Sequence, residues 1–172
     1  MIKRLPHKGN FGFTLIELLL YVSLMGVVVM ATTVFLTVLQ KQRVRSQVIM
    51  EVESQGIKLM QNFTQIVRNS TSISSPAVGV SSSSLTLVVP TGSLSPTVFG
   101  LSSGVVTMTE GVNPVVNLTS GKVIVSGLTF SNYSRASTKG NIRVQFVVSY
   151  NNPDGISEYT FSKTFISSAS LR

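Results

Sequence analysis

Few residues of this chain have the types and spacing of a catalytic set. The only histidine is His7, and there is no cysteine. Serine is abundant, but a nucleophilic serine needs a base beside it, and no histidine follows His7. Beyond residue 68 the acidic residues are Glu110, Asp154 and Glu158. We therefore expect no enzymatic activity and no cofactor.

The stretch "NNPDG", residues 151–155, is a candidate metal site. Asp154 and Glu158, with Asn151 and Asn152, offer the oxygen ligands that calcium takes in sets of about six to eight. The same stretch has the Asn, Pro, Asp and Gly of a hairpin turn, which is by far the more common reason for this composition. We expect a turn here and no bound metal.

The chemically conspicuous residue is Glu17, in the stretch "GFTLIELLLYVSL". No charged side chain occurs between Leu18 and Gln40, so Glu17 lies at the amino end of a long apolar run. A carboxylate at the centre of a bilayer costs about 2.5 kcal/mol or more on insertion scales. One explanation is that Glu17 reaches back to the lipid headgroups. The other is that a cation partner offsets its charge.

The apolar run is long enough to be a membrane-spanning helix. Residues 18–40 would extend about 34 Å at 1.5 Å per residue, against about 30 Å for the bilayer core. Lys3, Arg4 and Lys8 precede the run, and an equal number of basic residues follows it closely, so charge alone gives no clear orientation. The short leader favours an N-terminus in the cytoplasm and an extracytoplasmic C-terminal part.

The stretch "GFTLIELL" after a short basic leader resembles the processing motif of the type IV pilin and type II secretion pseudopilin superfamily. The resemblance implies that a prepilin peptidase removes residues 1–12 by cutting between Gly12 and Phe13. It then implies N-methylation of Phe13. In this family the methylated amine and a glutamate at the position of Glu17 pair between subunits during fibre assembly, so the resemblance assigns Phe13 and Glu17 to assembly. The expected partners are the peptidase, other pilin or pseudopilin subunits and the cytoplasmic membrane.

Two departures from major pilins favour a minor subunit or a pseudopilin. Many major pilins carry a proline in the middle of the membrane helix, and the corresponding place near Val34 has none. The carboxy-terminal cysteine pair of many major pilins is also missing. The sequence leaves open whether the chain serves a pilus, a type II secretion system or a competence system.

The helix is expected to continue from Phe13 to about Arg68, because no proline interrupts it and an apolar stripe follows the membrane half. Residues 13–40 form the transmembrane half and residues 41–69 the amphipathic half. Gly56 is a weak point that costs about 1 kcal/mol relative to alanine. The stripe consists of Val44, Val48, Val52, Leu59, Phe63 and Ile66.

A Ser-rich linker is expected over residues 70–84, followed by a β-rich domain over residues 85–172. The last two strands should form a hairpin about the "NNPDG" turn. The apolar stripe of the helix would cover the sheet, which gives an α+β fold with a long N-terminal helix packed on a C-terminal antiparallel sheet. The expected strands are residues 85–89, 105–109, 122–130, 141–150 and 158–166.

A basic group, Arg135, Lys139 and Arg143, is a candidate contact for DNA, although a solvated loop is the more common reason for such a group. The leading interpretation is a minor pilin or pseudopilin. The alternatives are a DNA- or surface-binding tip pilin, and an unprocessed single-pass anchor with an extracytoplasmic β scaffold domain.

Overall fold

The structure is a computed structural model that describes residues 12–135 and 139–172. The chain divides into two compact units, Met1–Gln42 and Arg43–Arg172. One helix, α1 (Leu15–Asn69), begins in the first unit and ends in the second. The predicted helix, from Phe13 to about Arg68, is confirmed to within two residues at each end.

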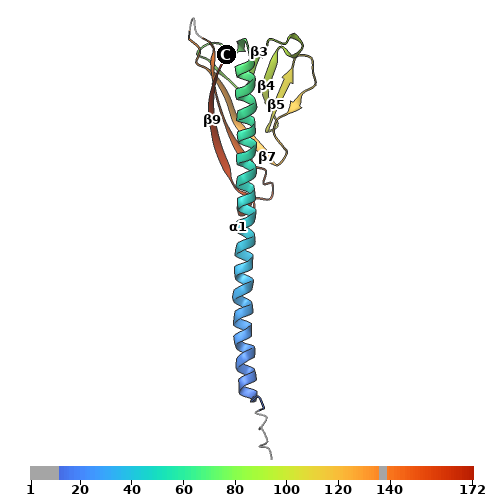
Figure 1. Ribbon diagram of the computed structural model, residues 1–172, viewed down its shortest axis with the longest axis vertical. Coiled ribbons are helices and arrows are strands. Elements are labelled where there is room, and N and C mark those ends of the chain that lie inside the picture. The colour runs from blue at the N-terminus through green and yellow to red at the C-terminus, as the bar shows by residue number, and fades with distance from the viewer. Residues whose placement is uncertain (1–11, 136–138) are drawn as a thin grey trace, which may run out of the picture. The chain divides into compact units, whose positions relative to one another are not determined.

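The second unit contains two antiparallel sheets rather than the single sheet that the sequence predicted (Figure 1). In the five-stranded sheet the order is β1-β3-β4-β5-β6, and in the four-stranded sheet it is β2-β7-β8-β9. The α+β class is confirmed. The strands are β1 (Ser72–Ser75), β2 (Ser81–Ser82), β3 (Leu85–Val88), β4 (Thr97–Ser102), β5 (Val105–Glu110), β6 (Val116–Asn117), β7 (Val123–Asn132), β8 (Asn141–Tyr150) and β9 (Ser162–Ser170).

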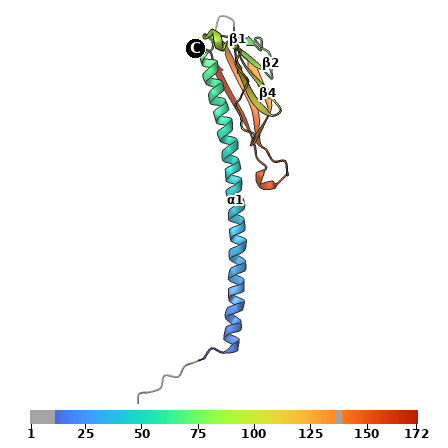
Figure 2. The ribbon, with the colours of Figure 1, turned by 90° about the vertical axis from the view of Figure 1, so that its right-hand side faces the viewer.

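Both sheets lie on the same side of the second half of α1 (Figure 2). Phe63 of the helix contacts Phe99 of β4, with ring centroids 6.0 Å apart, and Phe130 of β7 at 5.6 Å. One helical side chain therefore joins the two sheets into one core. The expectation that the helix covers the sheet is confirmed, and the helix is part of the hydrophobic core of the β domain.

The apolar stripe on the helix is confirmed over most of its length. Ile66, its last predicted member, is half-buried and packs against the core, and Val44 at the other end is half-buried too. Val67, which the predicted stripe left out, is fully buried. Phe63 and Val67 are four residues apart and so lie on one face, while Ile66 is turned by about 100° from Val67. The buried residues of α1 are Val48, Val52, Gly56, Leu59, Phe63 and Val67.

The Ser-rich segment expected as a linker forms strands β1 and β2. Its backbone is held by the folded neighbours: the side-chain amide of Asn132 donates to the carbonyl of Pro76 at 2.8 Å, and the N–H of Gly79 donates to the carbonyl of Asn132 at 2.8 Å. Serine has no strong strand preference, so these short strands depend on edges that the longer strands provide.

Two further differences concern the strands. Strand β4, which buries Thr97 and Phe99, was not predicted from the sequence. The final strand, expected over 158–166, begins only at Ser162, because a short 3₁₀ helix precedes it and holds Tyr159 against Tyr150, with ring centroids 5.7 Å apart. The predicted hairpin is confirmed: β8 and β9 pair without interruption from Asn141↔Ser170 to Ser149↔Ser162.

Gly56 has a packing role that helix propensity alone does not explain. A Cβ at this position would lie 2.2 Å from Cζ of Phe165, whose ring also stacks on Phe146 with centroids 5.5 Å apart. The Phe165 side chain is only 7% exposed, so its ring has little room to move away. The glycine therefore lets α1 approach β9 closely.

We expect Gly56→Ala to lower the free energy of unfolding of the β domain by about 1–2 kcal/mol. Overpacking costs about 1–3 kcal/mol, and the better helix propensity of alanine returns up to about 1 kcal/mol. Chemical denaturation measures the change. Gly121→Ala is the control, because nothing lies within 4 Å of its Cβ position. A Gly56→Ala protein as stable as the parent, or more stable, would contradict the packing role.

Candidate processing and assembly site

The predicted cleavage point lies just before the helix. Gly12, Phe13 and Thr14 have no regular secondary structure, and α1 begins at Leu15. No heavy atom lies within 4 Å of the position of a Cβ at Gly12, and the Phe13 side chain is 74% exposed. This segment is sterically open to another protein. The rest of the predicted leader, residues 1–11 with His7 and its basic residues, lies outside the described residues.

Thr14 caps the amino end of α1. Its carbonyl accepts from the N–H groups of Glu17 at 3.1 Å and Leu18 at 3.2 Å, and its hydroxyl accepts from the N–H of Glu17 at 3.4 Å. A threonine at the N-cap followed by a glutamate three residues later is the capping-box spacing. This cap was not predicted from the sequence, although the "TLIE" spacing is a sufficient signal for it.

Glu17 consequently has a local role in this structure, in addition to the assembly role that the resemblance implies. It lies in the first turn of α1, where the unpaired N–H groups and the helix dipole together present about half a positive charge. This favourable interaction offsets part of the cost of a carboxylate at the edge of an apolar layer. It does not replace a full positive charge, because the dipole effect is typically about 0.3–1 kcal/mol.

A second partner of Glu17 is Tyr21, one helical turn further along. The Tyr21 hydroxyl donates to Oε1 of Glu17 at 3.4 Å, and the Tyr21 ring meets that of Phe13 edge to face, with centroids 6.0 Å apart. The structure therefore brings together Phe13 and Glu17, the two residues assigned to assembly by the resemblance, through Tyr21. The role of Tyr21 was missed, although its i+4 spacing from Glu17 was visible in the sequence.

Beyond its first turns, α1 has the properties of a membrane span. The helix is long and apolar enough to cross a bilayer, and its apolar stretch near the N-terminus has no buried residue. Its hydroxyl groups are satisfied within the helix, as a lipid environment requires. Each hydroxyl donates to a backbone carbonyl three or four residues earlier in the helix. The pairs are Ser23 to Leu20, Thr32 to Val28, Thr33 to Val29 and Thr37 to Val34.

The basic group predicted as a candidate DNA contact is split between two places. Arg135 and Lys139 lie in the connection between β7 and β8, whereas Arg143 lies on the exposed face of β8, opposite Ser131 and Ser168. The base of this connection is closed by the N–H of Tyr133, which donates to the Asn141 carbonyl at 2.9 Å. The Tyr133 side chain is 59% exposed, an aromatic neighbour that the sequence analysis did not weigh.

The segment around Asp154 is a turn fixed by an asparagine. The side chain of Asn152 donates to the Ile156 carbonyl at 2.8 Å and accepts from the Ile156 N–H at 3.0 Å. This arrangement confirms the predicted turn chemistry. Over residues 12–135 and 139–172, no three or more His, Cys, Asp or Glu side chains gather as metal ligands.

A known protein family matches the N-terminal part of the chain. The family described as "Prokaryotic N-terminal methylation motif" matches residues 7–33, which contain Gly12, Phe13, Glu17 and Tyr21. No curated protein and no solved structure matches the chain. The exposed apolar helix, the open segment before it and the acidic first turn thus coincide with the matched motif. The chain carries the prokaryotic N-terminal methylation motif, the hallmark of type IV pilin and pseudopilin precursors.

Proposed function

We propose that the chain is a minor pilin or pseudopilin, cut between Gly12 and Phe13, methylated on Phe13 and then assembled into a type IV pilus-like fibre. The observation that carries the proposal is the first turn of α1, where Glu17 lies close to the end that cleavage would create and an exposed apolar helix follows. The missing mid-helix proline and cysteine pair support the minor role.

Before assembly, α1 anchors the subunit in the cytoplasmic membrane with its N-terminus inside and the β domain outside. Cleavage leaves a positive amine on Phe13, and methylation keeps that charge. An isolated subunit exposes this amine to headgroups and water, whereas a fibre buries it among neighbouring helices. There the carboxylate of Glu17 on an adjacent subunit offsets it, since a buried charge is stable only with a partner.

The cleavage step is tested by changing Gly12. Because the structure leaves open space at the Cβ position, a larger side chain does not disturb this chain itself. Any effect therefore arises in the cleft of the peptidase, where glycine allows the backbone to lie extended. Gly12→Val is expected to retain residues 1–12, and mass spectrometry of the protein co-expressed with its own peptidase measures this.

Gly12→Ala, which adds one carbon, is the matched control and is expected to remain a substrate. The parent protein should begin at Phe13 and carry the mass of an N-methyl group. A parent protein that keeps its first twelve residues beside an active peptidase would instead support the single-pass anchor, and the proposed function would be wrong.

A further inference from the structure

Among the described residues, β9 forms the longest unpaired sheet edge of the β domain; β2 leaves part of β7 unpaired as well. Within the described chain β9 pairs with β8 alone and forms one edge of the four-stranded sheet. It has nine residues, whereas the other edge strands, β1, β2 and β6, have four, two and two. A strand edge presents a row of N–H and C=O groups that another extended segment can pair with.

The hydrogen-bond pattern between β8 and β9 determines which backbone groups of β9 face the open edge. The Leu171 N–H donates to the Gly140 carbonyl at 2.9 Å, and the Tyr150 N–H donates to the Phe161 carbonyl at 3.0 Å. The register between them is continuous, so the odd-numbered residues of β9 bond to β8. The N–H and C=O groups of the even-numbered residues, including Ile166 and Ser168, therefore point to the open edge.

A charged side chain that hinders pairing with another strand is present only at the beginning of this edge. Lys163 forms an ion pair with Glu53 of α1, with Nζ and Oε1 2.5 Å apart. From Thr164 to Ser170 the strand has no charged residue, no proline and no bulge. These are the devices that usually prevent pairing with another strand, so most of β9 is open to it.

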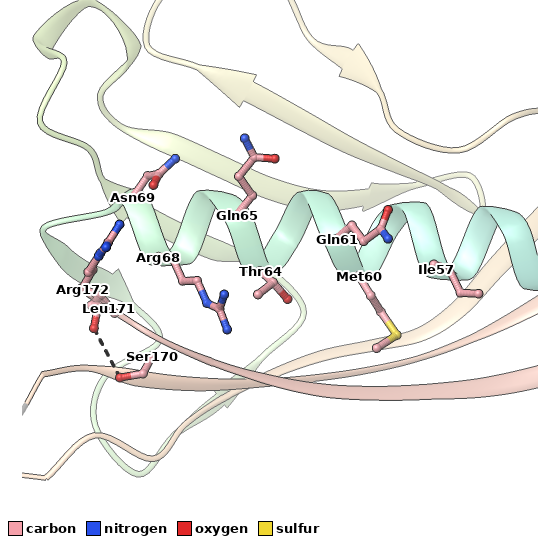
Figure 3. A pocket seen from close by; sticks show the side chains of 10 residues that line it. All are labelled: Ile57, Met60, Gln61, Thr64, Gln65, Arg68, Asn69, Ser170, Leu171 and Arg172. Carbon is pink, nitrogen blue, oxygen red and sulfur yellow. Dashed lines mark hydrogen bonds between the residues drawn. The ribbon is translucent and has the colours of Figure 1, made fainter.

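A groove of about 760 Å³ lies where β9 ends beside α1 (Figure 3). On the helix side, Ile57 and Met60 supply apolar surface, and the Ile57 side chain is 49% exposed. A strand added to β9 would extend the inner face of the sheet past this flank of the helix. Every second side chain would then face Ile57 and Met60, as in peptide recognition by strand addition. The lining residues are Ile57, Met60, Gln61, Thr64, Gln65, Arg68, Asn69, Ser170, Leu171 and Arg172.

The charge of the groove identifies the partner class. Both charged side chains that line it, Arg68 and Arg172, are arginines, and no aromatic side chain is among its lining residues for bases to stack on. Glu110 lies with the same two arginines along the adjoining pocket, not along this groove. The β9 strand of a second copy carries Lys163 and no acidic residue, so it does not complement these arginines. An acidic polypeptide segment does, because arginine binds carboxylates with two parallel hydrogen bonds.

We propose that this groove binds an extended acidic peptide segment of another protein, which adds to β9 as a fifth strand and places a carboxylate at Arg68. The proposal is independent of Glu17 and of cleavage at Gly12. It gives the β domain a binding function in addition to its place in a fibre. Main-chain hydrogen bonds to β9 supply the affinity. The arginines and the surface of Ile57 and Met60 determine which peptide sequences bind.

The test uses the full chain in detergent micelles and a fluorescein-labelled ten-residue peptide that alternates valine with threonine and has glutamate near each end. Fluorescence anisotropy measures its dissociation constant. We expect saturable binding that weakens about tenfold or more when the alternate amides are N-methylated, because N-methylation removes the donors that strand addition needs. Replacing both glutamates with lysine should weaken binding by about the same factor.

Two variants of the protein locate the site. Ser168→Pro removes an N–H that points to the open edge without breaking a bond to β8, since proline is tolerated on edge strands. We expect it to weaken binding about tenfold, while Ser168→Thr, which keeps the N–H, does not. Arg68→Glu should weaken binding similarly, and Lys58→Glu, the same charge change at an exposed helix residue outside the groove, should not.

Several results would overturn the proposal. One is the absence of saturable binding, and another is equal binding of the N-methylated peptide. Parent-like binding by Ser168→Pro and Arg68→Glu would also exclude the groove. A single-stranded oligonucleotide that displaces the peptide and depends on Arg68 but not on Ser168 would assign the groove to nucleic acid. A concentration-dependent dimer in analytical ultracentrifugation, abolished by Ser168→Pro, would assign the edge to a second copy.

Discussion

Glu17→Ala is expected to leave cleavage, membrane insertion and the β domain intact but to lower incorporation into fibres by a large factor. Removing one partner of a buried ion pair costs about 3–5 kcal/mol, because the other charge is left uncompensated. In the proposed fibre that charge is the methylated amine of Phe13 on a neighbouring subunit. Such a cost corresponds to about a hundredfold or more in an equilibrium constant at one interface.

The measurement is co-purification of the variant with assembled fibres, beside the amount in the membrane fraction. Membrane insertion should be unchanged or slightly better, since the apolar segment loses a carboxylate. The structure requires one more control. Glu17 also lies in the first turn of α1 and accepts from the Tyr21 hydroxyl, so alanine at this position removes these local interactions as well as the charge.

Glu17→Gln separates these two roles. Glutamine serves at the same position of a capping box but has no charge. If charge pairing is the role of Glu17, the glutamine variant should fail to assemble as severely as the alanine variant. If glutamine assembles like the parent while alanine does not, the local contacts of this side chain explain the effect and the intersubunit pair is wrong.

Normal incorporation of both variants has one further explanation within the proposed function. A subunit at the tip of the fibre contributes its amine to the next subunit, while its own carboxylate has no partner above it. Cross-linking between the variant and neighbouring subunits distinguishes a tip position, with neighbours on one side only, from a carboxylate that simply reaches the headgroups. The chain has no cysteine, so single introduced cysteines give specific cross-links.

A fragment from Ser46 to Arg172 is expected to be soluble and to unfold cooperatively. It keeps every buried helix residue from Val48 to Val67. A fragment that begins at Leu85 is expected to aggregate, because it exposes the core faces of both sheets as one large apolar patch. Each large apolar side chain contributes about 1.5–3 kcal/mol on burial, so losing several exhausts a total stability of about 5–15 kcal/mol.

A third fragment, beginning at Ser70, isolates the contribution of the helix. It keeps β1 and β2 but lacks α1, and so lacks Phe63, which contacts Phe99 and Phe130 in the two sheets. It should aggregate like the shorter fragment. Thermal unfolding and sedimentation measure both properties. Equal solubility and equally cooperative unfolding of the fragments from Ser46 and Ser70 would contradict the packing of the helix on the sheets.

The N-terminal helix and its buried face could be predicted from the sequence because the residues that determine them are close together in the chain. The uncharged run after Glu17 predicts a membrane helix by length and composition, and helical periodicity predicts the buried face from Val48 to Phe63. The motif around Gly12 and Phe13 is contiguous for the same reason. The cap by Thr14 was equally local, and its spacing could have been read from the sequence.

Tertiary structure alone decided the features that depend on contacts far apart in the chain. Strands β1 and β2 form from Ser-rich sequence because other strands supply their hydrogen-bond partners, which no local pattern encodes. Gly56 was predicted as a weakness of the helix, yet the ring of Phe165, more than a hundred residues away, needs the space that glycine leaves. The groove beside Arg68 likewise exists only because β9 ends next to α1 with one edge unpaired.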